Sequence, residues 1–85
     1  MIINKEWVNE NYHGEKHFVI PEGATEIGDY AFIGCESLRS VVIPDGVTEI
    51  GKDVFEGCNN LIIKCSPDST AEKYAKENNI KYEYI

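Results

Sequence analysis

The chain has 85 residues, enough for one small domain, and such a chain buries only about 60–65% of the surface that its unfolded form exposes. Its formal net charge is −7, from 8 basic and 15 acidic residues, and it contains no basic run. Proteins that bind a phosphate backbone or an anionic lipid surface need clustered cations, so neither nucleic acid nor a membrane surface is expected as a partner.

Membrane insertion is not expected either, because no apolar segment approaches the roughly 20 residues that span a bilayer. The first residues lack the charged, apolar and small-residue regions of a secretory signal. The sequence therefore predicts a cytoplasmic protein as given, and a cell-surface or secreted one if the chain is trimmed from a longer protein.

The start of the chain predicts a strand or hairpin. Ile2–Ile3 and Trp7–Val8 are its apolar pairs, and a turn is expected near His13–Gly14. Residues 18–20 then predict the first strand of the main body, with Val19 pointing outward and its two neighbours inward.

A long internal repeat follows. Residues 20–42 align with residues 43–65 at 11 of 23 positions, where unrelated stretches share about one or two. A repeat of this period indicates supersecondary units that stack on one another, because a single unit cannot bury its own apolar face.

Each unit predicts a strand, a turn, a second short strand and one or two brief helical turns. In the second unit these are residues 38–44, the turn Asp45–Gly46 with glycine at a positive φ, residues 47–51, and residues 52–58 ended by Gly57. The first strand alternates, with Leu38, Val41 and Ile43 inward and Arg39, Ser40 and Val42 outward.

Stacking the units places equivalent side chains in columns about 4.8 Å apart. The predicted columns are Ile20 over Ile43, Ile27 over Ile50, Phe32 over Phe55 and Leu38 over Leu61.

The repeated pattern Ile-Pro-x-Gly-x-Thr-x-Ile-Gly-x-x-x-Phe-x-Gly-Cys-x-x-Leu resembles the BspA-like leucine-rich repeat family and its 23-residue unit. The block Phe-x-Gly-Cys-x-x-Leu at 32–38 and 55–61 makes the resemblance specific. It implies a curved β/α solenoid, found in proteins often displayed on microbial surfaces, that binds other proteins. The family motif contains no catalytic residues, so the resemblance implies no enzyme and no cofactor.

After Leu61 the repeat shortens by one residue, which places Ile63 and Cys65 inward and Lys64 outward. Residues 66–68 close that strand, and a capping box between Ser69 and Glu72 begins a helix. The helix carries Ala71, Tyr74 and Ala75 on one face, runs to about Asn78, and ends with Asn79 as a left-handed terminator. Residues 80–85 alternate as a half-buried strand with Ile80, Tyr82 and Tyr84 on one side.

The expected fold class is therefore α/β, a short leucine-rich-repeat solenoid of about two 23-residue rungs within a single domain, 1–85. An N-terminal strand or hairpin cap (1–17) precedes the repeats (18–65), and a C-terminal helix–strand cap (66–85) follows them. Trp7, Tyr82 and Tyr84 are expected to cover the open ends rather than to bind a partner.

Three groups of residues invite a chemical function. The three cysteines, Cys35, Cys58 and Cys65, lack the spacing of a disulfide framework or a zinc site, and Cys35 and Cys58 are expected to be buried thiols. His13 and His17 are four apart, but the glycine between them opposes a helix, so a solvated turn is favoured over a metal site. Gly23, Gly28, Gly46 and Gly51 are turn residues, because no phosphate-binding motif surrounds them.

The predicted partner-binding face consists of the outward strand residues Val19, Arg39, Ser40, Val42 and Lys64. Strands of typical length give this face roughly 300 Å², below the roughly 800 Å² per partner of a standard interface. The leading hypothesis is a non-enzymatic protein-interaction module. The second is a structural unit that self-associates, and the third and weakest is a small cysteine-dependent enzyme.

Overall fold

The computed structural model describes residues 1–85 and contains seven short strands and two helices. The strands are β1 (Ile2–Ile3), β2 (His17–Val19), β3 (Glu26–Ile27), β4 (Ser40–Val42), β5 (Glu49–Ile50), β6 (Ile62–Cys65) and β7 (Lys81–Tyr84). The helices are α1 (Lys5–Asn11) and α2 (Thr70–Glu77). The protein therefore has the mixed α/β composition that the sequence predicts.

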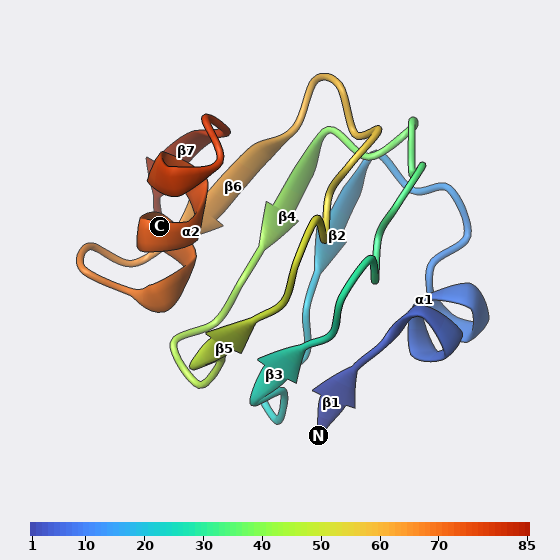
Figure 1. Ribbon diagram of the computed structural model, residues 1–85, viewed down its shortest axis with the longest axis horizontal. Coiled ribbons are helices and arrows are strands. Elements are labelled where there is room, and N and C mark those ends of the chain that lie inside the picture. Colours follow the sequence, from blue (N-terminus) through green and yellow to red (C-terminus); the bar gives the residue numbers. More distant parts are fainter.

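The strands form two parallel sheets, which we call sheet A (order β1-β3-β5) and sheet B (order β2-β4-β6-β7). Between β2 and β6 the chain alternates between the sheets, so each new strand pairs with the equivalent strand one repeat earlier (Figure 1). The helix α1 lies beside β1 at one end of the molecule, and α2 and β7 lie at the other end (Figure 1).

Strand register follows the repeat. His17 pairs with Ser40 and Glu26 with Glu49, both 23 positions apart. Ser40 pairs with Ile62, which is only 22 positions later. The predicted shortening by one residue is thus confirmed, and it leaves Ile63 and Cys65 fully buried.

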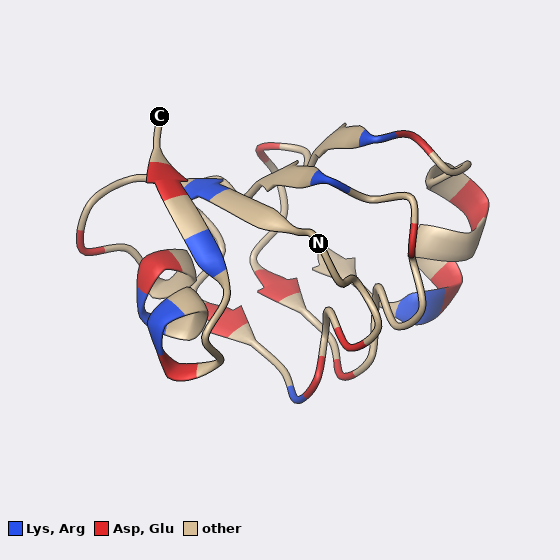
Figure 2. Ribbon diagram, turned by 90° about the horizontal axis from the view of Figure 1, so that it is seen from above, with Lys and Arg blue, Asp and Glu red and all other residues tan.

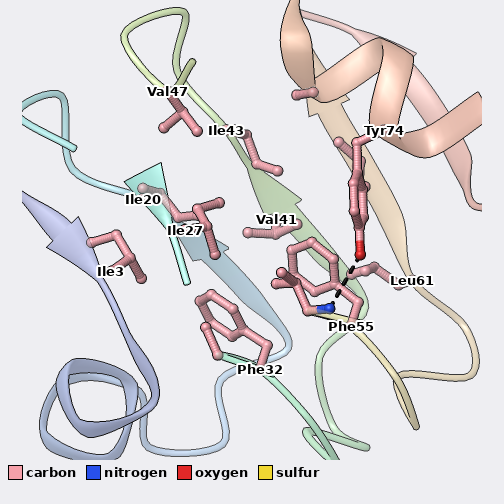
Figure 3. Close-up of a cluster of buried hydrophobic side chains, with 14 of the residues drawn as sticks. Ile3, Ile20, Ile27, Phe32, Val41, Ile43, Val47, Phe55, Leu61 and Tyr74 are labelled. Carbon is pink, nitrogen blue, oxygen red and sulfur yellow. Dashed lines mark hydrogen bonds between the residues drawn. The ribbon is translucent and has the colours of Figure 1, made fainter. Parts of the chain in front are cut away.

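The core lies between the two sheets and consists of apolar side chains that point toward one another (Figure 3). Phe32 stacks on Phe55 with 5.3 Å between ring centroids and 23° between ring planes, which confirms the predicted aromatic column. Tyr12 and Phe18 extend this column on one side of Phe32, and Tyr74 extends it beyond Phe55, through edge contacts of 5.5 to 6.3 Å. A chain of rings therefore runs through the molecule from one end to the other.

The predicted helical turn at residues 52–58 is wrong, since successive hydrogen-bonded turns occupy this segment. Asp53 adopts a positive φ of 50°, as does its equivalent Tyr30 at 59°, and such a residue interrupts helical geometry. The amides of the first unit also donate across to the second, as Phe32 N–H does to the Val54 carbonyl at 2.9 Å. Bonds between units thus use groups that a helix would need internally.

The positive φ predicted for Gly46 in the Asp45–Gly46 turn is also wrong, because the φ of this residue is not positive. A Cβ on Gly46 would lie 3.2 Å from the Ala24 carbonyl oxygen, and one on Gly51 would collide with the backbone and side chain of Asp29. These glycines are required because neighbouring units approach closely.

At the N-terminus the strand is confirmed and the hairpin is wrong. Residues 2–3 form β1, whereas Trp7 and Val8 lie in α1. Asn4 caps the start of α1, and its side chain accepts a hydrogen bond from Trp7 N–H at 2.8 Å. The chain then bends at Gly14, where φ is 86°.

At the C-terminus α2, its left-handed terminator Asn79 and β7 all occur as expected. Ser69 caps the helix by accepting the Glu72 N–H at 3.2 Å. The other half of the capping box differs, because the Glu72 carboxylate accepts the N–H of Asp68 at 2.8 Å rather than that of Ser69. The strand β7 pairs in parallel with β6.

Candidate functional site

The candidate site is the outer face of sheet B, which we define as the side of the sheet turned away from the core. Register places two rows of side chains on this face, because alternate residues of each strand point to opposite sides. The first row is His17, Ser40, Ile62 and Lys81, and the second is Val19, Val42, Lys64 and Glu83.

Three of the predicted face residues, Val19, Val42 and Lys64, lie side by side in the second row. Val19 is 65% exposed, a large fraction for a valine in a strand, while the other two are half-buried. This row therefore offers partly apolar surface to the solvent.

Ser40 faces the same side, but its side chain is buried, with 6% exposure for the residue. Its hydroxyl lies 2.7 Å from Nδ1 of His17. A serine beside a histidine is a possible nucleophile and base, but such a pair also needs a group that orients the histidine. No further hydrogen bond reaches the His17 ring, and the burial of Ser40 shields its hydroxyl from a substrate.

Arg39, the fifth predicted residue, is exposed just before β4, and its backbone N–H donates to the Lys16 carbonyl at 2.7 Å. Lys81 begins β7 at the same end of the sheet. Four of the eight basic residues of the chain thus lie along sheet B, namely Lys16, Arg39, Lys64 and Lys81. None of them is in an ion pair, since the one ion pair of the molecule joins Lys76 and Glu72 at 3.9 Å.

The acidic side chains are distributed differently. In sheet A, Glu26 and Glu49 are direct neighbours on β3 and β5. Other carboxylates lie on α1, α2, β7 and the turns between strands, while lysine and arginine are found in or just before the strands of sheet B and also on both helices and one turn (Figure 2). Sheet B and the residues just before β2 and β4 therefore hold four cations without ion-pair partners, and two of these, Lys64 and Lys81, lie on the outer face, which also carries Glu83.

The cysteines are poor candidates for chemistry. Cys65 is buried, but Cys35 and Cys58 are only half-buried, which corrects the predicted full burial. The Cys58 thiol donates a hydrogen bond to the Phe32 carbonyl at 3.2 Å, as expected for a thiol packed in a ladder. Burial raises the pKa of Cys58 to about 11 and also raises the pKa of Cys35, so both thiols stay protonated near neutral pH.

The two histidines have separate local partners. His13 N–H donates to the Glu15 carboxylate, whereas the His17 ring contacts Ser40. No three side chains of histidine, cysteine, aspartate or glutamate are grouped closely enough to hold a metal ion. Neither helix has the length and apolar character needed to cross a bilayer.

The end aromatics have mixed surroundings. Trp7 packs edge-on against Phe18 at 6.0 Å, and Tyr82 is half-buried beside Tyr84 at 6.0 Å. Tyr84 is 57% exposed, and its hydroxyl donates to the Glu72 carboxylate. Trp7 and Tyr82 thus cover the core, while much of the Tyr84 ring stays in contact with solvent.

Sequence reasoning missed His17, Ile62, Lys81 and Glu83 on the outer face. The signals for three of them were present in the sequence. Shortening the register by one residue turns Ile62 outward, and the alternation of residues 80–85 turns Lys81 and Glu83 outward once Tyr82 is placed inward.

Parallel strands that pair one repeat apart, with a side-chain column at each equivalent position, define a protein built from stacked repeats. The family model described as BspA type leucine rich repeat region (6 copies) matches residues 9–82. The chain therefore belongs to the BspA-type leucine-rich repeat family. Searches of curated proteins and of solved structures found no match.

Proposed function

We propose that the chain is a non-enzymatic protein-binding module and that the outer face of sheet B contacts the partner. The observation that carries this proposal is the group of four basic residues without ion-pair partners in and just before the strands of sheet B, together with the exposed Val19 at the end of β2, on a chain of net charge −7. Arginine is enriched at protein-binding surfaces, and cations without an ion-pair partner in their own chain can pair with an acidic surface of a partner.

The geometry supports a short solenoid as the scaffold for this face. Registers of 23 and 22 residues fit about two rungs over 18–65, with 1–17 and 66–85 as caps of a single domain. The protonated thiols and the shielded Ser40 favour binding over catalysis.

The test compares binding partners captured from an extract of the source cells by three forms of the chain. The double variant Arg39→Glu, Lys81→Glu changes the sheet face. The control Lys52→Glu, Lys73→Glu makes the same change in net charge at exposed positions elsewhere. We expect the face variant to lose at least one partner that both other forms retain. Identical partner sets for all three forms would contradict the proposal.

Self-association is a second candidate, because β2 and β7 are the open edges of sheet B and an unpaired edge can accept a strand from another copy. The alternating charges Lys81 and Glu83 on β7 oppose this pairing. Sedimentation at several protein concentrations separates the two candidates, because a protein that stays monomeric at every concentration excludes self-association.

A further inference from the structure

A groove of about 420 Å³ crosses the C-terminal ends of the strands in sheet B. We infer that this groove binds an extended partner segment in which lysine or arginine flanks an apolar anchor side chain. This inference rests on the proposed function, because the groove continues the outer face at Val19 and Val42.

The walls of the groove are apolar. They include Val19 and Val42 from the outer face, Pro21 and Pro44 from the turns that follow, and Ile85. Val19 is 65% and Ile85 66% exposed, so two large apolar side chains meet water here. The Ile85 N–H donates to the Cys65 carbonyl at 3.1 Å, which fixes this residue at the end of the sheet. Covering these side chains with an apolar group would be favourable.

Two carboxylates, Glu22 and Asp45, complete the groove. They occupy equivalent positions of the repeat, and their turns are stacked, since a Cβ on Gly46 would lie 3.5 Å from the Glu22 carbonyl oxygen. Both residues are exposed, and neither carboxylate takes part in an ion pair or a hydrogen bond. The groove therefore offers two negative charges without an ion-pair partner beside its apolar walls.

The size of the groove favours a short segment over a folded surface. Its volume lies at the lower end of the range of about 300–1,000 Å³ for ligand pockets. The charges favour a cationic segment, because the chain as a whole is also acidic and attracts cations. A lysine or arginine can lay its aliphatic part on the valines and proline rings while its charge reaches a carboxylate. A second copy of this chain, with the same net charge of −7, fits less well.

The experiment titrates the full chain, labelled with ¹⁵N, with a capped hexapeptide that alternates lysine and leucine. We expect saturable shifts of the amide signals of Val19, Val42 and Ile85, with a Kd on the order of 1 mM. A hexapeptide that alternates glutamate and leucine should leave these signals unchanged. One that alternates lysine and serine should bind about tenfold more weakly, because it lacks the apolar anchor.

Matched variants separate the groove from general charge attraction. Glu22→Lys, Asp45→Lys should weaken peptide binding at least tenfold, and Val19→Ser should weaken it severalfold. Glu10→Lys, Glu36→Lys changes the net charge equally at exposed sites outside the groove and should leave the Kd within about twofold.

Three results would overturn the inference: no saturable shift at the groove, equal losses in both charge variants, or a Val19-dependent dimer in place of peptide binding. Failure here remains distinguishable from failure of the proposed function. Suppose that a partner is lost with Arg39→Glu, Lys81→Glu but retained with Glu22→Lys, Asp45→Lys. This result would support binding at the outer face and contradict binding in the groove.

Discussion

At the N-terminal end of the molecule α1 buries only Val8, whereas at the C-terminal end α2 buries four residues, Ala71, Glu72, Tyr74 and Ala75. Both ends place a helix and aromatic rings against the same column. At the N-terminal end the contacts to the repeats are edge-on ring contacts and backbone bonds of β1, such as Gly28 N–H to the Ile3 carbonyl at 2.9 Å.

The side-chain hydrogen bonds of the C-terminal end are buried or partly buried, whereas most of those at the N-terminal end, such as the one from the Thr25 hydroxyl to the Met1 carbonyl at 3.2 Å, are exposed. Tyr74 accepts Val54 N–H at 3.1 Å through its hydroxyl, in a buried position (Figure 3). Glu72 binds Asp68 N–H and the Tyr84 hydroxyl at once. Buried polar bonds break at a high cost, so we expect the N-terminal end to open at a lower free energy than the C-terminal end.

The largest loss of stability is expected at Phe32, where the ring contacts from the two ends of the molecule meet. Phe32 is fully buried and contacts Tyr12 and Phe18 from one end and Phe55 from the other. Phe32→Ala should cost about 3–5 kcal/mol and unfold so small a protein. Thermal melting checks this, with the exposed Ile33→Ala as the control. A melting temperature of Phe32→Ala close to that of the wild type would show that the column of aromatic rings does not stabilise the fold.

A smaller effect should distinguish the ends directly. Tyr74→Phe keeps the ring but leaves Val54 N–H without its partner, at a cost of about 1–3 kcal/mol. Tyr12→Phe at the N-terminal end loses only an exposed bond to the Glu15 carbonyl and should cost less than about 0.5 kcal/mol. Urea denaturation of both variants measures the difference. Equal losses would show that the hydroxyl of Tyr74 does not fasten the C-terminal end.

The C-terminal end should also respond to pH. The hydrogen bond from Tyr84 lowers the pKa of Glu72, helped by Asp68 N–H and Lys76, and the same bond raises the pKa of Tyr84 to about 12. The lowered pKa stabilises the fold above the ordinary carboxyl range, and this contribution disappears as pH falls through the folded pKa. The raised pKa stabilises the fold below the ordinary tyrosine range, and this contribution disappears as pH rises toward about 12.

Denaturant unfolding of the wild type and Tyr84→Phe from pH 6 to 12 tests this coupling. We expect a constant difference in unfolding free energy between about pH 6 and 9 that shrinks above about pH 10. The carboxyl pKa of Glu72, followed by ¹³C NMR, should rise in the variant. A difference that is flat up to pH 12 would exclude the coupling.

The smallest change in stability is expected at Tyr30, in the repeats between the two ends of the molecule. Tyr30 adopts φ 59° and is 39% exposed, so Tyr30→Asn should relieve backbone strain while giving up the contacts of the covered part of the ring. We expect a gain of about 0.5–1 kcal/mol. Asp53→Asn at the equivalent position should change the free energy of unfolding by less than about 0.5 kcal/mol, because aspartate already tolerates this conformation. A loss of stability in Tyr30→Asn would show that the tyrosine ring contributes more than the strain costs.

Much of the fold was predictable because each unit of the repeat packs against an equivalent unit. Like residues stack, so the register of β2 on β4 and the Phe32–Phe55 column follow from alignment alone. The turns were less predictable. Asp53 and Gly46 have conformations set by the neighbouring unit, through bonds and close approaches that local propensity does not contain. The helix α1 was missed because its cap, Asn4, precedes only two turns of weakly periodic sequence.

The direction in which the side chains of the candidate site point was predictable, but their exposure to solvent was not. Alternation placed Val19, Val42 and Lys64 on the outer face. It did not reveal that Ser40 is buried beside His17, because that depends on which residue the neighbouring strand brings next to it. The groove at Ile85 required the parallel pairing of β7, which residues 80–85 alone do not specify.

Two equivalent segments of the repeat lie side by side in parallel, and scalar couplings across hydrogen bonds test this pairing most directly. A long-range HNCO experiment should connect the Ile20 amide to the Val42 carbonyl and the Thr48 amide to the Thr25 carbonyl. Observing both connections would confirm the pairing between repeats. Connections within each segment, of the kind that separate antiparallel hairpins produce, would contradict it.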